Sequence, residues 1–233
     1  ASDVRTVFES ASFTKGDYKS AVKDLSTIIE QTERPGLAHI DRALAYLLLG
    51  KERQALADLE AANRILPGYS SAHFYRGITL KRMRRYQQAG DAFRTAIELS
   101  AGGVAPAPIY FELAQTERSQ RNSDAALKSL DNAITSDPQY APAYFSRAVI
   151  HEDNNAPALA IADYNQYLTI QPESAEAYYN RGLIYQDLRQ DHLAIQDFNQ
   201  AIALNPRYVR ARASKGVTYL WPVLPVLLVL FLG

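Results

Sequence analysis

Histidine is the residue type in this sequence best suited to acid–base or metal chemistry, and the chain has four of them. They are His39, His73, His151 and His192. A helical zinc site needs two histidines four residues apart and a further ligand, and no pair here has that spacing. Gly102-Gly103 is not followed by the lysine of a phosphate-binding loop, and no serine lies in a nucleophile elbow. We therefore predict that the chain is not an enzyme and binds no metal or cofactor.

The composition narrows the classes of partner. Lysine and arginine number 25 against 25 aspartates and glutamates, so no net charge attracts nucleic acid or an anionic membrane. The chain has no cysteine, which excludes disulfides and thiolate chemistry but fits either a cytoplasm or a periplasm. The composition therefore leaves the compartment open and predicts no nucleic-acid partner.

An internal repeat organises the sequence. Alanine recurs in four steps of 34 residues and one of 37, at residues 21, 55, 89, 126, 160 and 194. A period of this length is typical of stacked supersecondary units. The predicted units are residues 2–35, 36–69, 70–103, 107–140, 141–174 and 175–208.

Each unit has the pattern of two helices. In the sixth unit apolar residues recur at the spacing of one helical face, from Tyr178 to Tyr185 and again from Ala194 to Ile202. A proline follows the second apolar stretch in several units, where it ends the helix. Because no segment alternates with a period of two, we predict an all-α protein.

The sixth unit shows which family the sequence resembles. Small, aromatic and proline residues fall at the spacing typical of a tetratricopeptide repeat, at Tyr178, Gly182, Tyr185, Ala194, Phe198, Ala201 and Pro206. The resemblance implies a right-handed α-solenoid of helix-turn-helix repeats, with six full units and residues 209–220 as the first helix of a partial seventh. The style of units five and six is similar to bacterial members of the family, which by analogy suggests a bacterial cytoplasm or periplasm.

The resemblance also implies a binding groove, lined by the first helix of each unit. Repeat positions 5 and 9 face this groove in the family, and here they are mostly apolar. The candidate groove residues are Ile40, Leu44, Phe74, Ile78, Phe111, Phe145, Val149, Tyr179 and Leu183, with Asn180 as a polar neighbour. Two interpretations are open: the aromatic residues pack against neighbouring helices, or they hold an extended peptide or an amphipathic helix. The lysines of the family's carboxylate clamp are replaced by Phe and Tyr, so that mode of binding is excluded.

Charged residues repeat with the same period and suggest a ladder between units. Position 7 is basic and position 23 of the preceding unit is acidic at four joints. The predicted inter-repeat ion pairs are Arg42 with Asp24, Arg76 with Asp58, Arg181 with Asp163, and Lys215 with Asp197. Such pairs would set the register of the stack more than they would stabilise it.

The last residues, 221–233, break the pattern with an apolar tail that contains no charge and two prolines. Three interpretations are open: a remnant that replaced the natural continuation, part of a membrane anchor, or a segment that occupies an apolar groove in its own or a neighbouring molecule. As a membrane span the tail is short, since about 20 apolar residues are needed. Membrane contact is expected only through this tail.

The expected function is protein–protein interaction, as a scaffold or adaptor that binds an apolar or aromatic-rich peptide or helix of another protein. Two alternatives stay open. One is a structural protein that self-associates by end stacking or by exchange of residues 221–233. The other is the interaction domain of a larger envelope or secretion component.

Overall fold

The computed structural model describes residues 16–100 and 106–220. The chain divides into two compact parts, Ala1–Asp137 and Pro138–Gly233, which are called the first and the second unit from here on, while each 34-residue helix pair is called a repeat. The tail at residues 221–233 and the first helix predicted for the first repeat lie outside the described residues.

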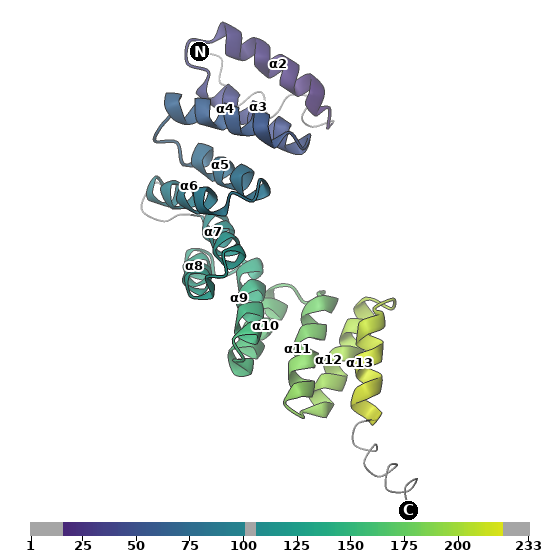
Figure 1. The fold of residues 1–233 in the computed structure, drawn as a ribbon. Helices are drawn as coiled ribbons and strands as arrows, with labels where there is room; N and C mark the ends of the chain where they lie inside the picture. Colours follow the sequence, from purple (N-terminus) through teal and green to yellow (C-terminus); the bar gives the residue numbers. More distant parts are fainter. Residues whose placement is uncertain (1–15, 101–105, 221–233) are drawn as a thin grey trace, which may run out of the picture. The chain divides into compact units, whose positions relative to one another are not determined.

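The described residues form helices and no strands (Figure 1), which confirms the predicted all-α repeat fold. In the first unit the helices are α2 (Tyr18–Gln31), α3 (Gly36–Leu48), α4 (Glu52–Ile65), α5 (Ser70–Arg82), α6 (Tyr86–Glu98), α7 (Ala107–Ser119) and α8 (Ser123–Ser136). In the second unit they are α9 (Ala141–Asp153), α10 (Pro157–Ile170), α11 (Ala175–Asp187), α12 (Asp191–Leu204) and α13 (Val209–Leu220). From α3 onward the odd-numbered helices are the first helices of their repeats, and each of α3, α5, α7, α9 and α11 packs on the even-numbered helix that follows it.

One turn geometry joins the two helices of each repeat. Its middle residue, repeat position 15, has a positive φ in every described turn, at Gly16, Gly50, Arg84, Arg121, Asn155 and Arg189. A left-handed residue ends the first helix and lets the chain reverse within three residues. Non-glycine residues tolerate this conformation, but β-branched residues do so only with strain.

The close contact between the two helices depends on a small residue at repeat position 8. A Cβ atom added to Gly77 would lie 2.5 Å from Cε1 of Phe93, and one added to Gly182 would lie 2.7 Å from Cε1 of Phe198. Both aromatic rings come from the second helix of the same repeat and are fully buried. The glycine therefore makes room for the aromatic ring.

The arginine–aspartate pairs lie inside repeats, so the predicted inter-repeat pairing is wrong. Arg42 donates from Nε to Asp58 Oδ2 at 2.8 Å and from Nη2 to Asp58 Oδ1 at 2.7 Å. Arg147 and Asp163, and Arg181 and Asp197, form the same two-bonded pair. The predicted partner of Arg42, Asp24, is exposed.

The reason is the geometry of an antiparallel helix pair. Positions 7 and 23 are equally distant from the turn centre at position 15, so they meet side by side within one repeat. The same two positions in consecutive repeats do not meet. Asp58 is therefore occupied by Arg42 rather than by Arg76, Asp163 by Arg147 rather than by Arg181, and Asp197 by Arg181 rather than by Lys215.

Other side chains connect consecutive repeats. Two of the arginines that bind an aspartate in their own repeat also reach the preceding repeat with their remaining nitrogen, Nη1. Arg42 Nη1 donates to Ser26 Oγ, and Arg181 Nη1 donates to Asn165 Oδ1. Lys81 of α5 also pairs with Glu112 of α7.

Candidate partner-binding face

The predicted groove residues lie on the first helices, and we call them the first-helix face. All except one are half-buried. The exception is Ile40, which is 5% exposed and packs with Ala62 and Ala72, so it is a core residue rather than part of an open groove.

Three aromatic residues of this face, Phe74, Phe145 and Tyr179, are anchored by the second helix of their own repeat. Ring centroids are 5.9 Å apart for Phe74 and Phe93, 5.5 Å for Phe145 and Tyr164, and 6.0 Å for Tyr179 and Phe198. Part of each ring is therefore used for packing. The core clusters that Phe74 and Phe145 join also contain side chains of the next first helix, Ile109 of α7 and Ile184 of α11, as the packing interpretation expected. The half-buried remainder is a rigid apolar surface.

A hollow of about 500 Å³ lies in the first unit beside Phe74. It is lined by Ser70, Ser71, Phe74, Ser100, Pro106, Pro108 and Ile109. Apart from the serine hydroxyls, the described side chains that line it are apolar, so it could receive an apolar side chain of another molecule.

A second cavity, of about 470 Å³, lies in the second unit beside Leu183 and is acidic. The ends of α9 and α11 line it with Glu152, Asp153 and Asp187, and none of the residues that line it is basic. Burial raises the pKa of Glu152, and its Oε1 is buried with no hydrogen-bond partner among the described residues. This cavity differs from the apolar groove that the sequence predicts.

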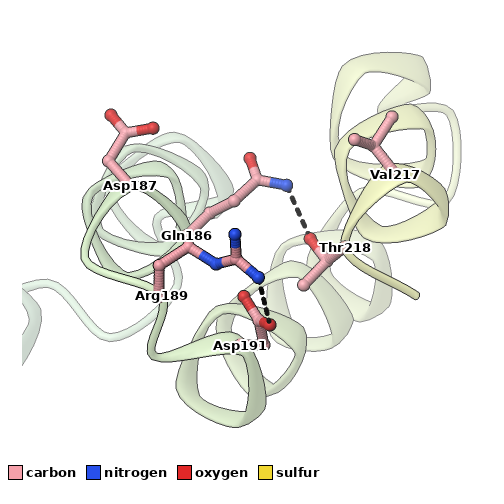
Figure 2. Close-up of a pocket in the computed structure, with 6 residues that line it drawn as sticks. All are labelled: Gln186, Asp187, Arg189, Asp191, Val217 and Thr218. Atoms are coloured by element: carbon pink, nitrogen blue, oxygen red, sulfur yellow. Dashed lines mark hydrogen bonds and ion pairs between the residues drawn. The ribbon is translucent and has the colours of Figure 1, made fainter. Parts of the chain in front are cut away.

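The same α11 end borders a third cavity, of about 300 Å³, that reaches α13. Figure 2 shows Gln186 crossing to Thr218 of α13, where its Nε2 donates to the threonine oxygen at 2.7 Å. Arg189, in the turn after α11, lies with its Nη2 4.0 Å from Oδ2 of Asp191, the first residue of α12. Asp187 lines this cavity and the acidic one, so it lies between the two.

The polar residue predicted beside the groove, Asn180, contributes to structure. Its Nδ2 donates to the hydroxyl of the fully buried Tyr164 at 3.2 Å. Burial, followed by hydrogen bonding to Glu152, raises the pKa of Tyr164. Asn180 therefore belongs to a polar contact between α10 and α11.

Comparison with known proteins identifies the repeat. Two tetratricopeptide repeat family models match, one at residues 111–175 and the other at residues 175–208. Residues 111–208 of the chain are tetratricopeptide repeats.

Solved structures share the fold of this tetratricopeptide repeat protein at low sequence identity. PilW, described as a widely conserved type IV pilus biogenesis factor, has a TM-score of 0.76 and 18% identity, over 90% of this chain and 95% of PilW. YrrB, described as a tetratricopeptide repeat protein with an unusual peptide-binding site, has a TM-score of 0.68 and 19% identity, over 84% of this chain and 99% of YrrB. MamA from Desulfovibrio magneticus RS-1 has a TM-score of 0.67 and 16% identity, over 76% of this chain and 98% of that chain.

The histidines of the tetratricopeptide repeat protein are scattered through its repeats. His39 Nδ1 lies 2.9 Å from Asp58 Oδ1, and His73 Nε2 lies 3.1 Å from the carbonyl oxygen of Pro67. His151 is half-buried and His192 is exposed. Among the described residues no three His, Cys, Asp or Glu side chains gather as a metal site would require. No described helix has the length and apolar character of a membrane span.

Two features of the structure were missed from the sequence. In the fourth repeat, where Leu113 and Ser129 replace the charged pair, Glu117 accepts a hydrogen bond from Ser129 Oγ at 2.7 Å and lies 3.8 Å from Arg94 of the preceding repeat. The two helices of this repeat are thus joined by a hydrogen bond to Glu117, whose ion contact is with the preceding repeat. Asp41 is 7% exposed, and burial raises its pKa to about 7. Its neighbours along the helix are largely apolar, which is the signal that could have indicated its burial.

Proposed function

We propose that this tetratricopeptide repeat protein is an interaction scaffold that holds a segment of a partner protein on its first-helix face. The match to the tetratricopeptide repeat family supports the general role of a scaffold for protein–protein interaction. The hollow beside Phe74 carries the finer proposal, because its anchored aromatic ring and apolar rim suit an apolar side chain of the partner. YrrB, a structural neighbour, is described as having a peptide-binding site, which is compatible with this use of the fold.

The experiment is to select peptides that bind the full chain from a random library and to measure their affinity for two variants. Ser71→Trp fills the hollow from an exposed position at the start of α5. We expect it to weaken the selected apolar peptides at least tenfold. Thr135→Trp, at an exposed position on the second helix α8, is the matched control and should leave the affinity unchanged. Equal affinities for both variants would contradict the proposal.

In the second unit the partner segment is expected to present a basic side chain with an apolar stem. The cavity beside Leu183 is lined by three carboxylates and no cation, while Leu183 and Leu188 supply apolar surface. A lysine or arginine has both features. Peptides selected at low salt should bind less tightly as the salt concentration rises. Asp187→Asn should lower their affinity several-fold, whereas the control Asp124→Asn on α8 should leave it unchanged.

A further inference from the structure

Repeat 3, residues 70–103, keeps the arginine of the contact between the two helices but not its acid. Position 7 is an arginine in repeats 2, 3, 5 and 6, whereas position 23 is an aspartate in repeats 2, 5 and 6 and Ala92 in repeat 3. Where both residues are present the arginine donates two hydrogen bonds to the aspartate, as Arg42 does to Asp58. In repeat 4 both charges are replaced together. Among repeats 2–6, Arg76 is thus the one arginine of this contact whose own repeat supplies no acid.

Two buried polar atoms of repeat 3 lie at this contact. Arg76 Nε and His73 Nδ1 are buried and have no hydrogen-bond partner among the described residues. His73 stands at position 4, where repeat 2 has His39 with its Nδ1 2.9 Å from Asp58 Oδ1. The two unpartnered atoms therefore belong to the two side chains that share one carboxylate in repeat 2.

No described acid from another element takes the place of that carboxylate. Helices α3, α4, α6 and α7 contact α5. Four of their acids bind other side chains: Asp58 binds Arg42, Asp91 binds Arg94, Glu112 binds Lys81 and Glu117 binds Ser129. The remaining acids form no hydrogen bond or ion pair with Arg76 or His73 in the described part of the chain; they are Asp41, Glu52, Glu60 and Glu98.

A small anion has the charge and the size of the group that repeat 3 lacks. Aspartate differs from alanine by one carboxylate, and Ala92 is 1% exposed, so the position faces the interior of the helix pair. An anion there accepts a hydrogen bond from Arg76 Nε and offsets the charge of the guanidinium. A water molecule could bridge the same two atoms, but it would leave that charge without a counterion.

The protonation of His73 follows from its second ring nitrogen. His73 Nε2 lies 3.1 Å from the carbonyl oxygen of Pro67, which can only accept a hydrogen bond, so Nε2 carries the proton of the neutral ring. Its Nδ1 can then donate to an anion only when the ring is protonated as well. Binding of the anion is therefore coupled to uptake of a proton by His73.

We propose that repeat 3 binds a small monovalent anion, chloride or a free carboxylate such as formate, between Arg76 and His73 at the position that the aspartate occupies in repeats 2, 5 and 6. The anion does for repeat 3 what the acidic side chain does for the others, and the stability of the repeat then depends on the anion concentration. None of the residues that line the hollow beside Phe74 takes part, so this proposal does not depend on the proposed function.

The test is urea unfolding of the full chain at constant ionic strength, with chloride exchanged for the larger sulfonate isethionate. Above the dissociation constant, each tenfold increase in chloride should raise the folding equilibrium constant about tenfold. Ala92→Asp supplies the acid from the chain and Arg76→Met removes the donor, so both should abolish this dependence. Arg53→Met, at an exposed position on α4, is the matched control and should keep it. No dependence in the unaltered chain, or the same dependence in Ala92→Asp, would overturn the proposal.

The width of the chloride NMR signal measures binding directly. The full chain should broaden this signal, and formate should reverse the broadening by competition. The effect should be larger at about pH 6 than at about pH 8, because histidine takes up a proton over this range. His73→Tyr introduces the residue that repeats 5 and 6 have at position 4 and should remove the pH dependence. Stabilisation by formate without broadening of the chloride signal would assign the site to a carboxylate, and an effect of neither anion would contradict the proposal.

Glu60 of α4 is the competing partner of Arg76. It stands at the position from which Ser26 and Asn165 accept a hydrogen bond from the arginine of the next repeat, and it is exposed. Glu60→Gln should leave the effect of chloride on unfolding unchanged. If chloride stabilises only the Glu60→Gln variant, Glu60 neutralises Arg76 in the intact chain and the proposal is wrong.

Discussion

Repeats 2 and 3, residues 36–69 and 70–103, form the same pair of helices but have different residues at two contacts between those helices. Repeat 2 places Asp58 between His39 and Arg42, whereas repeat 3 keeps His73 and Arg76 but has Ala92 at the position of the acid. As a result His73 Nδ1 and Arg76 Nε are buried without a hydrogen-bond partner among the described residues. Buried polar atoms without a hydrogen-bond partner are costly, so the two repeats hold the same backbone with unequal stability.

The two repeats also differ in how their helices fit together. Repeat 2 pairs Ala43 with Leu59, and repeat 3 pairs Gly77 with Phe93, and all four residues except Gly77 are fully buried hydrophobic side chains. The smaller residue on the first helix accompanies the larger ring on the second. The helix pair therefore tolerates a smaller residue on the first helix when the second helix carries a larger one. In repeat 3, by contrast, no other described residue replaces the acceptor that Arg76 Nε lacks.

The largest effect is expected from Gly77→Leu. Because a single added Cβ would already lie 2.5 Å from the Phe93 ring, the larger side chain should lower the free energy of unfolding by about 3 kcal/mol. Urea unfolding followed by circular dichroism measures this change. Gly68→Leu, at an open position, should change it by less than about 0.5 kcal/mol. The exchange of size is contradicted if Gly77→Ala lowers the free energy of unfolding and the double variant Gly77→Ala/Phe93→Leu does not recover part of that loss.

Asp58→Ala converts the contact of repeat 2 into that of repeat 3. It leaves Arg42 and His39 without their shared acceptor, and we expect a loss of about 2 kcal/mol. The exposed Asp24→Ala is the control and should cost less than about 0.5 kcal/mol. A double-mutant cycle with Arg42→Met should show coupling between Arg42 and Asp58, and coupling to Asp24 instead would restore the inter-repeat pairing.

Asp41 of repeat 2 should make stability depend on pH, whereas the residue at the same position of repeat 3 is Tyr75. Burial raises the pKa of Asp41 from 3.8 to about 7, so the folded state keeps a proton that the unfolded state has released. The stability contribution is therefore full below about pH 4 and is lost as the pH rises to about 7. Asp41→Asn should flatten this dependence and stabilise the protein at pH 8 by about 1.5 kcal/mol. An unchanged pH profile of thermal unfolding would contradict the raised pKa.

The smallest effect is expected from Ala92→Asp, which gives repeat 3 the acceptor that repeat 2 has. The new carboxylate can receive a hydrogen bond from Arg76 Nε, and we expect a gain of about 1 kcal/mol in the free energy of unfolding. The gain should disappear in the double variant Ala92→Asp/Arg76→Met. A loss of stability in the single variant would show that burial of the carboxylate outweighs its hydrogen bond with Arg76.

The repeat period and the type of its elements could be predicted from the sequence because they depend on local rules. Apolar residues at helical spacing, alanine in 34-residue steps and small residues opposite aromatic ones specify helix pairs wherever they occur. Gly182 and Ala194 are two of the small residues that carry the family pattern in the sequence, and both are buried. The first-helix aromatic residues were also placed on the correct helices.

The binding face was predicted less well, because exposure depends on neighbours distant in sequence. Ile40 has the same repeat position as Phe74, but Ala62 and Ala72 cover it. The acidic cavity beside Leu183 forms only where the ends of α9 and α11 approach each other. Neither feature follows from a periodic pattern.

The sequence by itself determined the repeated helix pairs, since each helix is specified by residues within its own 34-residue period. Only the tertiary structure decided which charges meet. Arg42 has one aspartate 18 residues before it, Asp24, and another 16 residues after it, Asp58. Pairing within a repeat is the less regular pattern in the sequence, because repeat 1 has Phe8 in place of the arginine and repeat 3 has Ala92 in place of the aspartate. The turn at position 15 settles the choice, because it folds the second helix back onto the first and brings Asp58 within 2.7 Å of Arg42.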